Sequence, residues 1–254
     1  MSLTKNEIKF IKSLHLKKNR TEHQLFIVEG EKLVNELIVQ DKFNIQNLYI
    51  TPAYSTDDIP NNLNFTLIND KDLDRISAFK TPNKVLAIVK QPNQTDINYN
   101  EKNLILFLDD IKDPGNLGTI IRTADWFGIT QIIASKNTVE LFNPKVIQAS
   151  MGAIYRINYF VKDLLEELTL FKQNNFSIMG AVIDGEDIYN TSMPEKNVLI
   201  MGSESHGLSK ELLAEITHKV SIPKFGKTES LNVAIATGVL LSEYKKDKFT
   251  PQKL

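Results

Sequence analysis

The sequence predicts an α/β protein in two parts, a small N-terminal α/β domain followed by a mostly parallel sheet flanked by helices. Residues 104–108 form a continuous apolar run, as expected of a strand that is buried on both faces. After this run, strand-like and helical patterns alternate at regular spacing, which is typical of a parallel sheet. A polar stretch without periodicity, residues 91–102, separates this second part from the first and is the expected linker.

In the first part, residues 1–90, hydrophobic residues recur at helical spacing. Ile8, Ile11 and Leu14 share one face of an expected helix, and Leu33, Val34, Leu37 and Ile38 share a face of the next. The expected helices are residues 4–18, 29–40 and 71–78, and the expected strands are residues 47–50, 65–68 and 85–89.

The second part, residues 103–254, contains the more regular alternation. Its expected strands are residues 104–108, 131–134, 153–157, 177–183, 198–201 and 219–222. Its expected helices are residues 117–127, 144–150, 162–174, 210–217 and 231–245. The last of these helices is apolar nearly all round from residue 231 to 241, so it is expected to be buried.

The composition is that of a soluble globular protein, with 42% hydrophobic and 24% charged residues. No apolar run approaches the ~20 residues that span a bilayer, so no membrane association is expected. Charged residues at positions 5, 7 and 9 stand where a signal peptide would be apolar, so a cytoplasmic location is expected. The absence of cysteine excludes thiolate metal sites, and four scattered histidines make a metal centre unexpected.

The net charge of −1 conceals a basic cluster at the N-terminus. Residues 1–20 contain a single acidic residue, Glu7, and six basic ones: Lys5, Lys9, Lys12, Lys17, Lys18 and Arg20. Such a cluster is able to contact phosphates. A solvated helix face is the other interpretation, and charge alone favours it.

The first of three polar turn motifs follows the strand at residues 104–108. Asp113-Pro114-Gly115 reads as a turn, and Asn116 is a natural N-cap for the helix that follows. Arg122 lies six residues after Asn116 and borders the expected buried stripe of that helix. The turn alone does not explain this arginine.

The second motif, residues 202–207, follows the strand at 198–201. Gly202 allows another group to approach its backbone closely, and Glu204 lies in the loop that Gly207 closes. Routine strand-to-helix turns also contain such glycines. The motif lacks the G-x-G-x-x-G pattern, which disfavours a dinucleotide-binding loop.

The third motif joins Ile222-Pro223 to Ser230-Leu231-Asn232 at the start of the last helix. A helix N-terminus offers free amide donors and favours an anion. Ser230 is a candidate N-cap, and Asn232 needs hydrogen-bond partners if the helix is buried. Because ligand sites in α/β sheets lie outside the carboxyl ends of strands, the three motifs together predict one composite site.

In their order and spacing, these motifs resemble the signatures of the SpoU/TrmH branch of the SPOUT superfamily, the 2′-O-ribose RNA methyltransferases. The resemblance covers residues 103 to about 245. It implies a C-terminal trefoil knot, a homodimer joined through this domain, and S-adenosylmethionine as the methyl donor. The residues it implies as cofactor contacts, largely through backbone, are Gly202, Ile222 and Leu231. The catalytic group it implies is Asn116, Arg122, Glu204, Ser230 and Asn232.

Two further features bear on the substrate. Residues 1–90 resemble the RNA substrate-binding domain that many of these enzymes carry, most recognisably at residues 26–34, and this domain is related to small ribosomal proteins. The resemblance turns the basic cluster into a candidate RNA contact and favours ribosomal over transfer RNA. Gln148 stands where many relatives have arginine, so a phosphate contact at that position is not expected.

Several alternatives remain open at the level of sequence. The chain could be a non-catalytic RNA-binding protein that kept the fold, a transfer RNA 2′-O-methyltransferase, or a base methyltransferase from another branch. A nucleotide-dependent oxidoreductase is a distant possibility. The family proposal makes Arg122 the base, but a guanidinium scarcely deprotonates in proteins. We therefore expect Arg122 to bind a neighbouring phosphate or polarise the hydroxyl.

Overall fold

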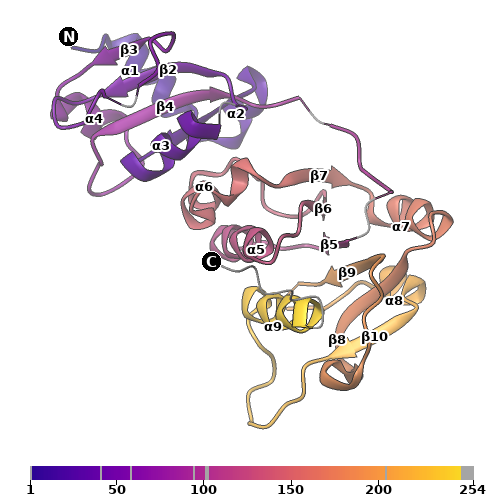
Figure 1. The fold of residues 1–254 in the computed structure, drawn as a ribbon. Helices are drawn as coiled ribbons and strands as arrows, with labels where there is room; N and C mark the ends of the chain where they lie inside the picture. Colours follow the sequence, from indigo (N-terminus) through magenta and orange to yellow (C-terminus); the bar gives the residue numbers. More distant parts are fainter. Residues whose placement is uncertain are drawn as a thin grey trace, which may run out of the picture. The chain divides into compact units, whose positions relative to one another are not determined.

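The structure is a computed structural model that describes residues 2–246, except residues 41, 58, 94, 101, 102 and 204. Its contacts divide the chain into two compact units (Figure 1). Unit 1 comprises Met1–Gln94 together with Glu140–Tyr155, and unit 2 comprises Thr95–Val139 together with Arg156–Leu254. The segment Glu140–Tyr155 is thus part of unit 1, although the sequence places it inside the second domain.

Unit 1 is built on a four-stranded mixed sheet in the order β1-β4-β2-β3. The central strand β4 pairs antiparallel with β1 and with β2, and β2 pairs parallel with β3. The strands are β1 (Leu25–Glu29), β2 (Ile45–Ile50), β3 (Phe65–Leu67) and β4 (Val85–Lys90). The helices of residues 1–94 are α1 (Lys5–Ser13), α2 (Lys17–His23), α3 (Glu31–Gln40) and α4 (Asp70–Ile76).

The helical faces predicted for unit 1 are confirmed, but two elements differ. Ile8, Ile11 and Leu14 are buried. The single helix expected over residues 4–18 is two helices, because Leu16 adopts an extended conformation (φ −96°, ψ 132°) that separates α1 from α2. Strand β1 was not predicted, although all five of its residues are buried and it forms a full ladder with β4.

The segment Glu140–Tyr155 completes the core of unit 1. It contains α6 (Pro144–Ser150) and a short 3₁₀ turn, η1 (Ala153–Tyr155). The ring of Phe142 stacks on that of Phe26 with centroids 4.4 Å apart, and Ile147 and Tyr155 are buried in the same hydrophobic cluster. The strand predicted at residues 153–157 is wrong, because left-handed backbone at Met151 and Gly152 (φ 50° and 91°) leads into the 3₁₀ turn.

Arg20 joins the same segment to α2 by a buried ion pair. Its side chain is 2% exposed, and it donates from Nε to Glu140 Oε1 at 2.9 Å and from Nη2 to Oε2 at 2.7 Å. Its Nη1 donates to the carbonyl oxygen of Leu14 at 2.8 Å. The interpretation of Arg20 as an RNA contact is therefore wrong, because its guanidinium is buried and already bound.

Unit 2 is a six-stranded sheet in the order β10-β8-β9-β5-β6-β7, and every neighbouring pair is parallel. Its strands are β5 (Leu104–Leu108), β6 (Gln131–Ser135), β7 (Asn158–Lys162), β8 (Ser177–Asp187), β9 (Asn197–Met201) and β10 (His218–Ser221). Its helices are α5 (Pro114–Trp126), α7 (Leu164–Gln173), α8 (Lys210–Glu215) and α9 (Val233–Lys246), with a 3₁₀ turn η2 (Ile188–Asn190).

Helices cover both faces of this sheet, as predicted for the second part of the chain. Helices α5 and α9 pack against each other, and α7 packs against α8 (Figure 1). Ile105 and Phe107 of β5 belong to the hydrophobic cluster that includes residues of α7 and α8. The fold class predicted from the sequence is confirmed. Within the described residues, no helix has the length and hydropathy needed to cross a membrane.

Candidate active site

A pocket of about 830 Å³ in unit 2 brings together the second and third sequence motifs. Its wall includes residues 181–184 of β8, the loop that follows β9, and the long loop between β10 and α9. Gly202, Ile222 and Leu231, the three residues expected to contact the cofactor, all line it. Their predicted convergence is therefore found, while their contact with a cofactor stays a prediction.

Gly202 is required by the loop itself. A Cβ atom at this position would lie 2.5 Å from the carbonyl carbon and oxygen of Gly207 and 2.7 Å from the nitrogen of Leu208. Ser203 and Gly207 exchange two backbone hydrogen bonds that close the loop, at 3.1 and 2.9 Å, and Gly207 has a positive φ of 67°. The group that approaches Gly202 closely is thus the far side of its own loop.

A side-chain hydrogen bond joins the first motif to the third. The Nδ2 of Asn232 donates to Oδ1 of Asn116 at 3.0 Å, across 116 positions of sequence. The Oδ1 of Asn232 accepts from the backbone nitrogens of Ala234 and Ile235 at 3.0 and 3.3 Å. These bonds fix which end of each amide faces which partner. The first and third motifs therefore meet in space, as predicted, while their role in one catalytic site stays a prediction.

The two helix starts at the site are capped by residues other than those expected. Asp113 caps α5 by accepting from the nitrogen of Asn116 at 2.8 Å, so Asn116 lies inside the first turn. Asn232 caps α9, whose first residue is Val233, and Ser230 is exposed and forms no hydrogen bond among the described residues. Glu204 lies outside the described part of the chain.

The structure does not bring Arg122 to the Asn116–Asn232 contact. Arg122 is exposed on α5 and forms no hydrogen bond or ion pair within the part of the chain that the structure describes. Six residues along a helix are about 1.7 turns, which places Arg122 on a different side of α5 from Asn116. Its guanidinium is therefore available to a ligand.

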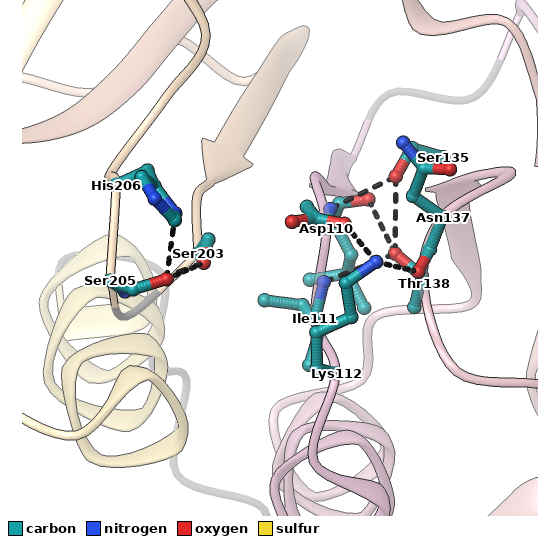
Figure 2. A network of polar contacts seen from close by, with 10 residues as sticks. Asp110, Ile111, Lys112, Ser135, Asn137, Thr138, Ser203, Ser205 and His206 are labelled. Carbon is teal, nitrogen blue, oxygen red and sulfur yellow. Dashed lines mark hydrogen bonds and ion pairs between the residues drawn. The ribbon is translucent and has the colours of Figure 1, made fainter.

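A polar network that the sequence did not reveal holds the loop between β5 and the first motif (Figure 2). The Asp110 nitrogen donates to Ser135 Oγ at 2.9 Å, and the Ile111 nitrogen donates to Thr138 Oγ1 at 3.3 Å. Lys112 Nζ pairs with Asp110 Oδ1 at 2.5 Å and donates to the carbonyl oxygen of Asn137 at 2.9 Å. These bonds fix the approach to Asp113.

The loop after β9 carries a second, smaller polar group, also shown in Figure 2. Ser205 Oγ lies 3.1 Å from Ser203 Oγ and 2.7 Å from His206 Nδ1. All three residues line the 830 Å³ pocket.

Burial raises the pKa of Asp109, which directly follows β5, and a hydrogen bond with Ser135 opposes this rise.

The outer face of α5 and α9 is apolar and exposed, contrary to the expectation that the last helix is buried all round. Ile235 of α9 is 57% exposed, and Trp126 of α5 is 85% exposed. A hollow of about 440 Å³ runs between the two helices, lined among others by Thr119, Thr123 and Ile235. Apolar surface of this kind commonly marks a protein interface.

The lysines of the N-terminal cluster lie on α1 and α2 of unit 1. We call them the basic patch: Lys5, Lys9, Lys12, Lys17 and Lys18. All five are exposed, and none forms an ion pair among the described residues. This geometry leaves them accessible to a polyanion.

Comparison with known proteins assigns the chain to a family. Residues 103–242, more than half of the chain, match the SpoU rRNA Methylase family, and residues 5–87 match the MRM3-like substrate binding domain. The chain belongs to the SpoU rRNA methylase family. This confirms the resemblance seen in the three motifs and in the N-terminal part.

Relatives of this family resemble the chain over nearly its whole length. The 23S rRNA (guanosine(2553)-2′-O)-methyltransferase RlmP of Bacillus subtilis is 27% identical over 94% of this chain and 96% of its own. A putative RNA methyltransferase of the TrmH family from Porphyromonas gingivalis is 38% identical, with a TM-score of 0.87 over 97% of this chain and all of the other. An AdoMet-bound rRNA methyltransferase from Sinorhizobium meliloti is 30% identical, with a TM-score of 0.85 over 98% of each.

Proposed function

We propose that this protein transfers a methyl group from S-adenosylmethionine to a ribose 2′-hydroxyl of ribosomal RNA. The observation that carries the proposal is the 830 Å³ pocket, which joins the two cofactor motifs of a SpoU-family fold. The AdoMet-bound structure of the Sinorhizobium meliloti relative supports the same cofactor here.

The pocket suits this cofactor in size and in lining. Small-molecule pockets commonly enclose about 300–1,000 Å³ and combine apolar walls with a few polar groups. Here Leu208, Ile222 and Leu240 supply apolar wall, and Ser203 and Ser230 supply hydroxyls. Gly202, Ile222 and Leu231 would hold the cofactor largely through backbone groups. When bound, S-adenosylmethionine supplies an electrophilic methyl group on its sulfonium.

On the acceptor side, the chain's own residues position the ribose. The side chain of Asn232 is held by its cap bond to α9 and by its bond to Asn116. These bonds orient the side-chain amides of Asn116 and Asn232 beside the pocket. Arg122 binds a neighbouring phosphate or polarises the hydroxyl, because its guanidinium keeps its proton. Glu204 and Ser230 complete the proposed catalytic group, Glu204 by organising the loop and Ser230 by bonding the acceptor.

We assign RNA affinity mainly to the N-terminal domain, residues 1–90, through the basic patch. We assign catalysis to residues 103–254, except for the segment Glu140–Tyr155 that packs in unit 1, and take residues 91–102 as the linker. Ribosomal RNA is the preferred substrate, because the relatives with matching architecture are named as ribosomal RNA enzymes. A cytoplasmic location follows from such a substrate.

We further propose that the protein is a homodimer joined through the α5–α9 face, with a trefoil knot at the C-terminus as in the family. Exposed Trp126 and Ile235 support the dimer, since two copies would cover this apolar surface. Trp126→Asp should shift the mass measured by light scattering from dimer to monomer. A variant that keeps the dimer mass would exclude this face.

The catalytic proposal is tested at Arg122. Arg122→Ala should abolish methyl transfer while leaving calorimetric S-adenosylmethionine affinity close to that of the wild type, because Arg122 belongs to the acceptor side. Arg122→Lys should restore little activity, since lysine lacks the planar fork of donors. Substantial activity in the lysine variant would reduce the role to charge. Mapping ribose methylation in a deletion strain would identify the nucleotide.

A further inference from the structure

The long loop between β10 and α9 presents an aromatic side chain to solvent at the mouth of the pocket. Phe225 is 94% exposed, the highest value among the large apolar side chains that the structure describes, and it lines the 830 Å³ pocket. None of the roles assigned to this loop explains the ring, since Ile222, Ser230 and Leu231 supply its cofactor and catalytic residues. An exposed aromatic at a binding pocket is a functional candidate.

Phe225 is part of an apolar rim. Ile183 of β8 is 73% exposed and Leu231 is 48% exposed, and both line the same pocket. Three exposed apolar side chains, one from β8 and two from the loop between β10 and α9, therefore line one pocket. A flat aromatic face beside such a rim suits a planar ring such as a nucleobase.

The charges beside Phe225 indicate what kind of molecule carries that ring. Lys224 lines the pocket, Lys227 follows on the same loop, and both are exposed. Neither lysine forms an ion pair or hydrogen bond in the described part of the chain. Two acidic residues, Asp184 and Glu229, and one more lysine, Lys219, also line the pocket. Lys224 and Lys227 flank Phe225 on the exposed part of the loop, where their positive charges attract a phosphate backbone.

We propose that Phe225 is a stacking platform for a nucleobase of the RNA substrate, with Lys224 and Lys227 holding the flanking phosphates. The inference rests on the proposed function, since it places the RNA strand at the mouth of the cofactor pocket. A ribose hydroxyl reaches such a pocket when its nucleotide leaves the base stack, and unstacked bases are commonly held on aromatic side chains. Phe225 replaces the stacking that the nucleotide gives up.

The test measures binding of a mixed-sequence single-stranded 12-mer oligoribonucleotide to the full-length protein in the presence of S-adenosylmethionine. Stacking on an aromatic ring tolerates any base, so the oligonucleotide need not be the natural substrate. Phe225→Ala should weaken binding roughly 5- to 150-fold. Phe225→Leu should show most of this loss, whereas Phe225→Trp should bind like the wild type, because it keeps the π-face.

Two controls separate the sources of stacking. Leu170→Ala removes a 40% exposed apolar side chain from α7 and should leave RNA binding unchanged. S-adenosylmethionine affinity, measured by calorimetry, should be the same in every Phe225 variant. If Phe225→Ala weakens cofactor binding by the same factor, the ring stacks on the cofactor's adenine and the proposal is overturned. Unchanged RNA binding in Phe225→Ala also overturns it.

The phosphate contacts are tested by salt dependence. For a single strand, each lost phosphate contact should reduce the slope of log affinity against log salt by about 0.7. Lys224→Gln and Lys227→Gln should each do so, whereas Lys172→Gln, at a lysine paired with Glu215, should not. Slopes equal to that of the wild type would show that Lys224 and Lys227 do not contact phosphates. Failure of the proposed function is distinguishable, because wild-type protein would then methylate no ribosomal RNA regardless of these affinities.

Discussion

Asn232 has two separable tasks, and one pair of substitutions should distinguish them. Its Oδ1 caps α9 by accepting from the nitrogens of Ala234 and Ile235, and its Nδ2 donates to Asn116. Asn232→Ala removes both. Asn232→Asp keeps an acceptor for the cap, adds a negative charge that the helix N-terminus favours, and removes the donor.

The expected size of each effect follows from the bonds that each variant loses. Loss of an asparagine N-cap costs about 0.5–2 kcal/mol, and loss of a hydrogen bond costs about 0.5–1.5 kcal/mol. Asn232→Ala should therefore lower the free energy of unfolding by about 2 kcal/mol. Asn232→Asp should stay within about 1 kcal/mol of the wild type, because a favourable helix-dipole interaction of about 0.3–1 kcal/mol offsets the lost bond.

Activity should follow a different order from stability. Both variants should lose methyl transfer roughly 100-fold, because neither fixes Asn116 in place and small displacements at a reacting centre are costly. Urea unfolding followed by circular dichroism gives the stability, and transfer of labelled methyl to ribosomal RNA gives the rate. Asp163→Ala is the matched control, since Asp163 caps α7 in the same way and lies outside the pocket lining.

Either of two results would refute this reasoning. Wild-type turnover by Asn232→Asp would show that the bond to Asn116 is dispensable for the chemistry. If Asn232→Asp lost as much stability as Asn232→Ala, the Oδ1 atom of Asn232 would not be acting as the cap of α9. The control should lose about 1 kcal/mol of stability and no activity.

Three further predictions concern other parts of the molecule. Gly202→Ala should abolish S-adenosylmethionine binding, measured by calorimetry, because the new Cβ would collide with the backbone of Gly207. The circular dichroism spectrum should stay unchanged. Normal cofactor affinity would contradict this prediction. Glu140→Gln should lower the free energy of urea unfolding by about 3 kcal/mol, since it leaves Arg20 buried without its counter-charge. Replacing both Arg20 and Glu140 with apolar residues should recover most of that loss. Equal losses in the single and the double variant would argue against the ion pair. Changing four lysines of the basic patch to glutamine should weaken RNA binding and flatten its salt dependence, without changing cofactor affinity or dimer mass. An unchanged slope of log affinity against log salt would show that the patch is a solvated helix face.

Regular elements were predictable where the pattern had one interpretation. Strand β5 occupies the predicted residues 104–108, because five consecutive apolar residues between polar ones fit a doubly buried strand. Helix α6 also has its predicted bounds. The short segment at residues 153–157, apolar except for Arg156, has no such unique interpretation, and periodicity cannot separate strand from helix over so few residues. Tertiary packing in unit 1 decides its conformation.

The site was predictable as a set of motifs but not in its hydrogen bonding. Sequence order indicated that Asn116 and Asn232 converge, and the structure shows their direct bond. The sequence did not indicate correctly which residues cap α5 and α9, since several neighbouring polar residues can serve as caps. Arg20 was misassigned because a charge pattern carries no information on a partner 120 positions away. The network around Ser135 and Thr138 left no pattern in the sequence.

The sharing of Glu140–Tyr155 with unit 1 has a consequence for biogenesis. The first 94 residues leave the ribosome before this segment is made. The N-terminal unit then lacks Phe142, which stacks on Phe26, and Glu140, the counter-ion of Arg20. Roughly 60 further residues must be translated, which takes about 3–12 s at the usual rate of synthesis. During that interval the apolar surface around Phe26 and the guanidinium of Arg20 are exposed to solvent. Transiently exposed apolar surface of this kind favours aggregation of a nascent chain.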